Sequence, residues 1–328
     1  MYITDQGDKN MVFIYILAGV IFLALLISYI AFFMAFYNSD KQKAYLSNPR
    51  LPLEGEEYAE FNEFILKNVE KIDSHPYEAV TVKSKDGKKL FGRYYHRGDG
   101  LPVEIFVHGY RACGLRDGSG SFKLSEEAGF NLLVIDQRSN GSSEGNVITF
   151  GVKEKLDILE WINYVVERFG KDVRIILAGI SMGASTVLLV SELDIPENVK
   201  CITADCGFSS QCEIIKKVAR EMKMPIALLF PFLKLGALVY GGFKLDSRTP
   251  LDAVKKAKVP IMFIHGDCDT FVPCHMCDEL YDACTSPKRK LIVKNAAHGL
   301  SFFVDNETYK DYLHEFFSSS GAITDWER

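Results

Sequence analysis

Six short apolar runs set the strongest limit on how this chain can fold. Each run is rich in valine, isoleucine and leucine, and helical patterns stand between the runs. Continuous apolar strands that alternate with helices are typical of a mostly parallel sheet covered by helices on both faces. The chain is therefore predicted to be an α/β protein. The expected strands are residues 103–107, 132–135, 173–180, 199–204, 259–264 and 290–293, and the expected helices are residues 119–128, 152–169, 182–193, 275–284 and 309–318.

A β-hairpin is expected just before this series. Residues 79–83 and 90–95 form its strands, and Lys85-Asp86-Gly87 forms its turn. At 328 residues, of which 48% are hydrophobic, the chain can bury a large core. The α/β domain is expected at residues 77–320, followed by a short tail at 321–328.

The N-terminal region contains a long apolar segment, because residues 11–37 carry no charged side chain. About 20 apolar residues suffice to cross the hydrocarbon layer of a bilayer. A cleaved signal peptide is the alternative, but its apolar region is usually about 7–15 residues long and ends at a small-x-small site. We therefore expect a short tail at residues 1–10 and a single transmembrane helix at 11–37 that anchors the protein in the membrane.

The charges that flank this segment bear on its orientation. Lys9 precedes it, whereas Lys41, Lys43 and Arg50 follow it, which favours a domain on the cytoplasmic face. Most of the eight cysteines fall in expected strands or helices and show no disulfide framework, which points the same way. Long domains can be translocated despite such charges, so the opposite orientation stays open. A net charge of -5 with mixed signs argues against nucleic acid as a partner.

Two further segments flank or interrupt the expected α/β domain. Residues 38–76 are expected to form a stalk with an amphipathic helix, and residues 207–258 form an insertion between two strands. The centre of the insertion, residues 224–240, is nearly all apolar, but Pro231 and Lys234 argue against a second membrane span. We expect a small helical lid there, which suits an acyl chain or an aromatic acid. Packing of the same residues on the sheet is the alternative.

One serine lies between two glycines where a strand pattern changes to a helix pattern. In LAGISMGAS, Ser181 stands between Gly179 and Gly183. A sharp strand-to-helix turn strains its central residue and needs flanking residues without bulk. Such a turn lifts the hydroxyl above the carboxyl edge of the sheet, so Ser181 is the predicted nucleophile. The pattern alone also fits an ordinary glycine-flanked turn.

A serine nucleophile needs a base, and the base needs an orienting acid. Of the seven histidines, His298 follows the last strand, at the sheet edge where Ser181 is expected. Asp269, in the loop after the preceding strand, is the predicted acid. Asp267 is better placed to hold that loop, and Asp205 is the alternative acid. The order serine, aspartate, histidine is the one associated with this type of turn.

Negative charge that develops on a substrate carbonyl needs two fixed donors. The backbone N–H of Met182, directly after the nucleophile, is one candidate. The backbone N–H of Tyr110, in the loop after strand 103–107, is the other. His108 is expected to orient that loop.

Together these motifs resemble the α/β-hydrolase superfamily over about residues 79–317. More narrowly, the chain is similar to the bacterial serine-aminopeptidase-like or Bem46-like serine hydrolases. The resemblance implies Ser181 as nucleophile, His298 as base and Asp269 as acid. Ser139 departs from the pattern, since relatives often carry glycine or alanine there. The matching segments are His108-Gly109-Tyr110, Asp136 to Ser143, Gly179 to Gly183, His265 to Asp269, and His298-Gly299.

The predicted activity is hydrolysis of a small-molecule carboxylic ester with an apolar acyl part, as in a carboxylesterase or lipase. The reaction passes through an acyl-enzyme on Ser181. An amidase or aminopeptidase acting on small peptides is the alternative. A catalytically silent binding protein is disfavoured by the intact set of serine, aspartate and histidine. The oligomeric state does not follow from the sequence.

No cofactor and no metal ion are predicted. Cys268, Cys274, His275 and Cys277 lie close together in the sequence. Zinc sites usually need paired ligands at closed spacing, which only Cys274 and Cys277 offer. These thiols are expected to pack against other residues.

Overall fold

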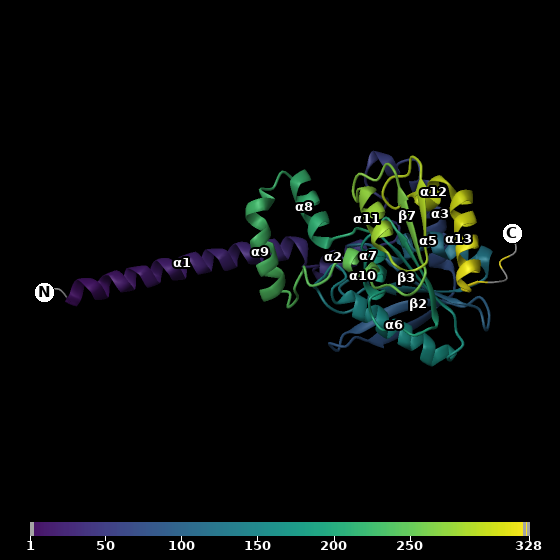
Figure 1. Cartoon of the computed structure of the whole chain (residues 1–328), viewed down its shortest axis with the longest axis horizontal. Helices are drawn as coiled ribbons and strands as arrows, with labels where there is room; N and C mark the ends of the chain where they lie inside the picture. The colour runs from purple at the N-terminus through teal and green to yellow at the C-terminus, as the bar shows by residue number, and fades with distance from the viewer. Residues whose placement is uncertain (1–2, 324–325, 327–328) are drawn as a thin grey trace.

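The computed structural model describes residues 3–323 and residue 326. A long helix, α1 (Ile3–Ala35), projects from a body that contains the sheet (Figure 1). The sheet has eight strands in the order β1-β2-β4-β3-β5-β6-β7-β8. The strands are β1 (Glu78–Lys83), β2 (Lys89–Tyr95), β3 (Val103–Val107), β4 (Asn131–Asp136), β5 (Ile175–Ile180), β6 (Val199–Asp205), β7 (Ile261–Gly266) and β8 (Lys288–Val293).

The sheet is mostly parallel, as the apolar runs predict. Only the hairpin β1–β2 and the pairing of β2 with β4 are antiparallel. Every residue of β3, β4 and β7 is buried, because helices cover both faces. The predicted α/β class is confirmed. Each strand begins and ends within two residues of its predicted boundary.

The two faces of the sheet carry separate hydrophobic cores. On one face lie α6 (Glu154–Phe169), α7 (Met182–Val190), α10 (Pro250–Val254) and α11 (His275–Ala283). On the other face lie α3 (Asn62–Ser74), α4 (Gly114–Asp117), α5 (Ser119–Ala128), α12 (Ser301–Val304) and α13 (Asn306–Ser320).

The N-terminal helix ends earlier than the expected span. It stops at Ala35, and Tyr37 forms an antiparallel bridge with Val147 in the body. Its stretch Lys9–Ala35 is long and apolar enough to cross a membrane. The segment expected as a stalk, which includes α2 (Asp40–Leu46), lies along the body, and α3 buries Ile65 there.

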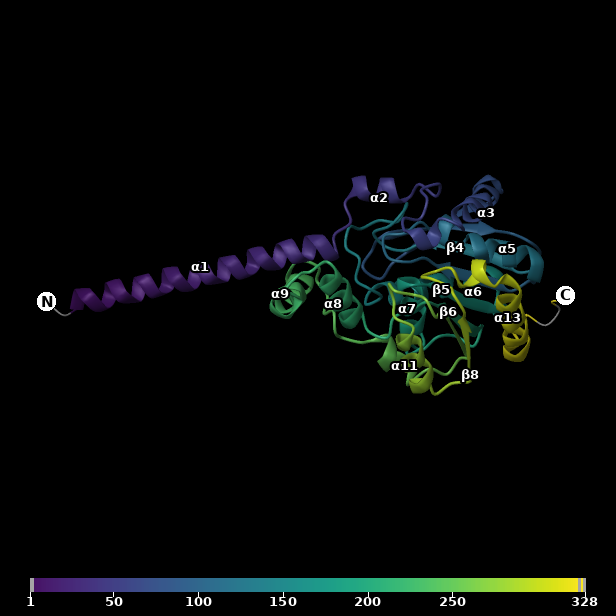
Figure 2. The same cartoon turned by 90° about the horizontal axis from the view of Figure 1, so that it is seen from above.

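The insertion at residues 207–258 is helical. It contains α8 (Gln211–Glu221), α9 (Ile226–Val239) and α10. Figure 2 shows α9 beside the body end of α1 rather than on the sheet. Its inward side chains join those of α1 and of the body in one apolar group, here called the lid cluster. The lid cluster includes Phe32, Phe36, Phe150, Met182, Phe208, Leu233 and Ala237.

The turn after β4 explains the unusual serine in the family pattern. Ser139 has φ 65, a left-handed conformation that glycine adopts more easily. Its hydroxyl donates to the carbonyl oxygen of Val147 at 2.8 Å, which offsets part of the strain. In the same turn the buried Arg138 guanidinium donates twice to the Asp157 carboxylate, at 2.6 Å each.

We predict that Asp157→Ala lowers the free energy of unfolding by about 3–5 kcal/mol, because it leaves a buried guanidinium without its main partner. Glu78→Ala is the control, since it removes an ion pair with Arg168 at the surface, in which the Glu78 side chain is exposed. Its cost should stay below about 1 kcal/mol. Chemical denaturation of the full chain in detergent measures both. Equal losses would contradict the prediction.

Candidate active site

The turn between β5 and α7 presents Ser181 in a strained conformation. Its φ is 55 and its ψ is -120. The neighbouring glycines permit this turn, because a Cβ on Gly179 would lie 2.5 Å from the carbonyl carbon of Gly183, and one on Gly183 would lie 2.0 Å from the carbonyl oxygen of Val107. The Ser181 N–H donates to the Asp205 carbonyl oxygen at 2.9 Å, which ties the turn to β6.

Three side chains that follow β5, β7 and β8 meet at the carboxyl edge of the sheet. The Nε2 atom of His298 lies 2.9 Å from Ser181 Oγ, and its Nδ1 atom lies 2.7 Å from Asp269 Oδ2. An ionised carboxylate only accepts hydrogen bonds, so Nδ1–H donates to Asp269 and Nε2 is left to accept from the serine hydroxyl. The structure thus brings together the three residues predicted as a triad.

The Asp269 carboxylate is held in its charged form. Burial alone would raise its pKa, but hydrogen bonds from His265 and His298 lower the pKa well below its usual range. Its other oxygen, Oδ1, accepts from the backbone N–H groups of Phe271 and Val272 at 2.9 and 2.8 Å. The loop is therefore shaped around an anionic carboxylate.

The two other aspartates considered from the sequence lie elsewhere. The buried Asp205 carboxylate accepts from Ser301 Oγ at 3.0 Å and from the Tyr309 hydroxyl at 3.3 Å, on the α12–α13 side of the sheet. Asp267 Oδ1 accepts from the Asn295 N–H at 2.6 Å and so links the two loops. Neither carboxylate has a hydrogen bond to His298 among the described residues.

Two neighbours of this group were not singled out from the sequence. The buried His265 has its Nε2 atom 2.8 Å from the Val272 carbonyl oxygen and 3.2 Å from Asp269 Oδ2, so its N–H is shared between two acceptors. Tyr58, from the expected stalk, donates its hydroxyl to the His298 carbonyl oxygen at 3.0 Å. The position of His265 four residues before Asp269 was a signal available in the sequence.

The loop after β3 lies directly beside the nucleophile. A Cβ on Gly109 would lie 3.4 Å from the Cβ of Ser181, and the Gly109 N–H donates to Asp117 Oδ2 at 2.9 Å. The backbone N–H groups of Tyr110 and Met182, the predicted donors, have no acceptor among the described residues. His108 Nε2 accepts from the Gln137 N–H at 3.0 Å and so anchors the start of this loop.

The same loop is tied to the end of α1, a connection that the sequence did not predict. The Tyr110 hydroxyl donates to the Ala35 carbonyl oxygen at 2.8 Å. The Arg111 guanidinium donates to the Met34 and Tyr37 carbonyl oxygens at 3.1 and 2.7 Å. The bonds to Met34 and Ala35 satisfy carbonyl groups of the last helical turn, which have no partner within the helix. The end of α1 therefore supports the loop beside Ser181.

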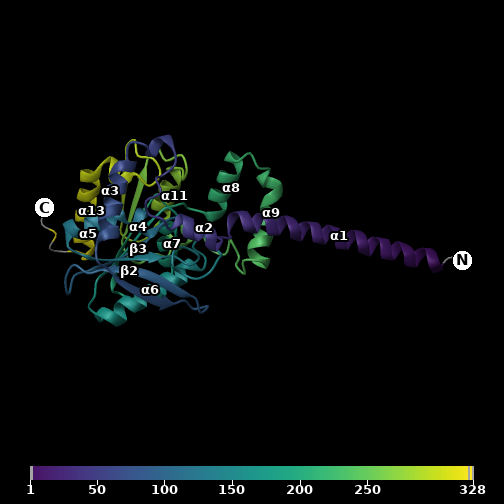
Figure 3. The ribbon, with the colours of Figure 1, turned by 180° about the vertical axis from the view of Figure 1, so that it is seen from behind.

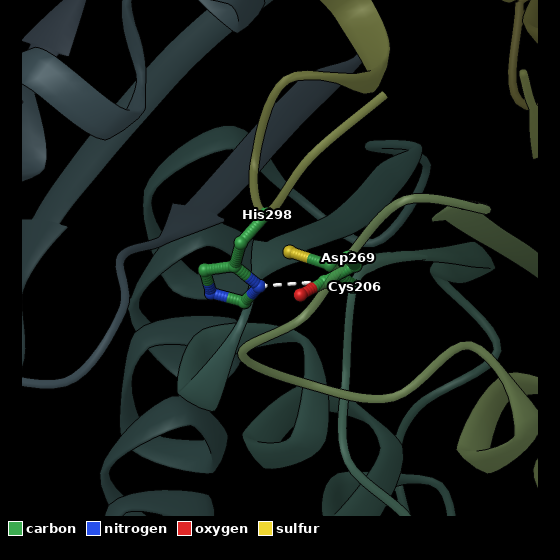
Figure 4. Close-up of side chains that lie close together, drawn as sticks. All are labelled: Cys206, Asp269 and His298. Atoms are coloured by element: carbon green, nitrogen blue, oxygen red, sulfur yellow. Dashed lines mark hydrogen bonds and ion pairs between the residues drawn. The ribbon is translucent and has the colours of Figure 1, made fainter. Parts of the chain in front are cut away.

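One cysteine lies against the triad. The side chains of Cys206, Asp269 and His298 lie together in Figure 4, with potential ligand atoms within 4.8 Å of one another. Burial raises the pKa of the Cys206 thiol well above its usual range. An ion here would compete with the hydrogen bond between His298 and Asp269. Among the described residues, Cys268, Cys274, His275 and Cys277 do not come together as a possible metal site.

Comparison with known proteins agrees with this architecture. The profile of the family described as alpha/beta hydrolase fold matches residues 105–225. The esterase Pf2001 of Pyrococcus furiosus has a similar structure, with a TM-score of 0.63 and 23% identity, covering 77% of this chain and 93% of the esterase. The chain has the α/β-hydrolase fold. Its predicted resemblance to the α/β-hydrolase superfamily is confirmed.

Further matches bear on the chemistry of this α/β hydrolase. The profile of the serine hydrolase (FSH1) family matches residues 179–300, which include both Ser181 and His298. Acylaminoacyl peptidase of Pyrococcus horikoshii has a similar structure, with a TM-score of 0.56 and 21% identity, covering 79% of this chain and 43% of the peptidase. The protein is an α/β serine hydrolase.

Two curated proteins are similar in sequence. YqkD of Bacillus subtilis (strain 168) is 27% identical, over 78% of this chain and 84% of YqkD. The lysophosphatidylserine lipase ABHD12 of Xenopus tropicalis is 24% identical, over 66% of this chain. The match spans 55% of the lipase.

Proposed function

We propose that this protein is a membrane-anchored serine hydrolase that cleaves carboxylic esters with an apolar acyl part. The observation that carries the proposal is the continuous set of hydrogen bonds from Ser181 Oγ through His298 to Asp269, at 2.9 and 2.7 Å. In this arrangement a weak nucleophile, a base and an orienting acid are within hydrogen-bonding reach before substrate arrives.

The proposed reaction is acyl transfer in two steps. His298 Nε2 takes the proton of Ser181 as its Oγ attacks the ester carbonyl, and then gives it to the leaving alcohol. Water attacks the acyl-enzyme in the second step, with the same base. The depressed pKa of Asp269 keeps its carboxylate anionic. The carboxylate therefore holds the Nδ1–H tautomer of His298 and stabilises the imidazolium that forms.

Two backbone amides are proposed to stabilise the oxyanion. The N–H of Met182 lies at the start of α7, and the N–H of Tyr110 lies in the adjacent loop. Donors of this kind act on charge that develops only during reaction, so they lower the barrier rather than tighten substrate binding. The strained turn at Ser181 and the loop at Tyr110, which is bonded to the end of α1, would hold these two amides in place.

The preference for apolar esters is supported by the surroundings of Ser181. Met182 belongs to the lid cluster, and the Tyr110 ring lies 5.0 Å from that of Phe150 between centroids. Pf2001 is named an esterase and ABHD12 a lysophosphatidylserine lipase, which agrees with an acyl substrate. The similarity to an acylaminoacyl peptidase supports the second candidate, an amidase or peptidase.

Membrane anchoring is proposed from α1. Its stretch Lys9–Ala35 is longer than the about 20 residues that a bilayer requires. Because its last turns are bonded to the loop at Tyr110 and Arg111, removal of α1 as a signal peptide would disturb the body. The flanking lysines and arginine favour the cytoplasmic face for the body.

We predict that a fluorophosphonate probe labels the full chain and that Ser181→Ala abolishes labelling, because the probe reacts with an activated serine. Ser142→Ala, at an exposed serine, is the control and should label like the wild type. In-gel fluorescence of the detergent-solubilised protein measures both. Undiminished labelling of the Ser181 variant would refute the nucleophile.

We predict that Tyr110→Phe lowers kcat about fivefold with little change in KM. It removes a hydrogen bond worth about 1 kcal/mol that positions the proposed oxyanion donor, and such a loss appears in the barrier. Tyr240→Phe is the matched control, since its hydroxyl also donates to an α1 carbonyl, that of Leu25 at 3.1 Å, but from the lid. Steady-state kinetics compare them. An equal effect of both variants on kcat would contradict a role of this contact in catalysis.

We predict that p-nitrophenyl acyl esters are hydrolysed faster than aminoacyl anilides, with a preference for chains longer than acetyl because of the apolar surroundings. The panel uses the full chain in detergent, with Ser181→Ala as the blank. If the anilides are the better substrates in kcat/KM, the amidase or peptidase alternative is correct instead.

A further inference from the structure

The helices α1 and α9 cross in close contact. Ser28 of α1 is fully buried, and a Cβ on Gly236 of α9 would lie 2.3 Å from the Ser28 carbonyl oxygen. Small residues permit such an approach between helix backbones. The Tyr240 hydroxyl donates to the Leu25 carbonyl oxygen, and its ring lies 5.3 Å from that of Tyr29 between centroids. The two helices therefore form one fixed unit.

The position of the crossing along α1 sets its depth in a membrane. At about 1.5 Å per residue, Ser28 lies about 28 Å along the helix from Lys9. The hydrocarbon layer is about 30 Å thick. The boundary of that layer cannot lie much before Ser28 without drawing Lys9 into hydrocarbon. If α1 spans the bilayer, α9 lies at or just inside the boundary of the layer.

The direction of α9 fits that depth. Figures 1 and 3 show α9 running across α1 rather than along it. A helix that crosses a membrane span in this way lies in the plane of the bilayer, as interfacial helices do. The tyrosines at the crossing, Tyr29 and Tyr240, are of the type that is enriched at this level of membrane proteins.

Most of the outward surface of α9 is apolar, and its one charged side chain, Lys234, is paired with Asp246. Leu228 is 68% exposed and Leu238 is 57% exposed, although both belong to a helix whose other side is buried in the lid cluster. At the end of α8, the exposed Met222 lies next to the exposed Lys223, and the exposed Arg220 and Glu221 precede it. Exposed apolar side chains next to charged ones suit the boundary between acyl chains and headgroups.

We propose that α9 is an interfacial helix whose outward surface, from Leu228 to Val239, is immersed in the lipid bilayer beside α1. This inference rests on the anchoring part of the proposed function. In this placement the lid contacts the membrane directly. The lid cluster then connects the bilayer surface to Met182, beside the nucleophile.

Tryptophan fluorescence tests this placement in the full chain. Leu228→Trp and Leu238→Trp are reconstituted in phosphatidylcholine vesicles whose acyl chains carry bromine, a contact quencher, near the headgroup or near the methyl end. Phe22→Trp reports on α1, and Tyr312→Trp, on α13 at the far side of the body, is the unimmersed control. The signal of the native Trp161 and Trp326 is subtracted with the wild type.

The expected result is strong quenching of both α9 probes by bromine near the headgroup, to a similar extent, with Phe22→Trp quenched and Tyr312→Trp unchanged. Similar quenching at both ends means that α9 lies parallel to the membrane plane. If Phe22→Trp is quenched while the α9 probes behave like Tyr312→Trp, the inference is overturned and the anchor stands. Quenching of the α9 probes by the methyl-end bromines alone also overturns it. If Phe22→Trp is unquenched, the anchor fails, and this inference fails with it.

Discussion

The close contact between α7 and β3 is the constraint on which the rest of the site depends. The Cα of Gly183 lies so near the Val107 carbonyl that a side chain at this position would clash with it. This contact brings the first turn of α7 against the strand that leads into the loop at Gly109. Ser181 is thereby held at positive φ, with the amide of Met182 on one side and the loop of Tyr110 on the other. Strain at one residue is stabilised by packing at two glycines.

The order of the strands determines which loops can reach this serine. Because β5, β6, β7 and β8 are neighbours and parallel, the loops after them open at the same edge. Asp269 and His298 lie in loops beyond the ends of β7 and β8, where the chain can turn towards Ser181. Asp205 is still within β6, so the pleat directs its side chain to the α12–α13 face. Asp205 contacts the turn at Ser181 through its backbone carbonyl oxygen, which accepts from the Ser181 N–H, and not through its carboxylate.

Helix α1 belongs to two environments. Its first part has exposed apolar side chains and little contact with the body, whereas Phe32 and Phe36 are buried in the lid cluster. Its C-terminal carbonyls accept from Tyr110 and Arg111, in the loop beside the nucleophile. The helix is therefore a structural part of the catalytic body as well as its proposed attachment to a membrane. An apolar run in a sequence carries no sign of which residues lie in lipid and which in protein, since both environments exclude water.

The parallel sheet and the sharp turn at Ser181 could be predicted from the sequence alone. The periodicity of the strands predicted the parallel sheet, and the glycines around Ser181 predicted the sharp turn, because both are local consequences of side-chain size and burial. Two contacts between distant segments were decided only by the tertiary structure: Tyr58 on His298, and α9 across α1. Both contacts join residues more than 200 positions apart, and no local pattern in the sequence encodes which distant segments meet.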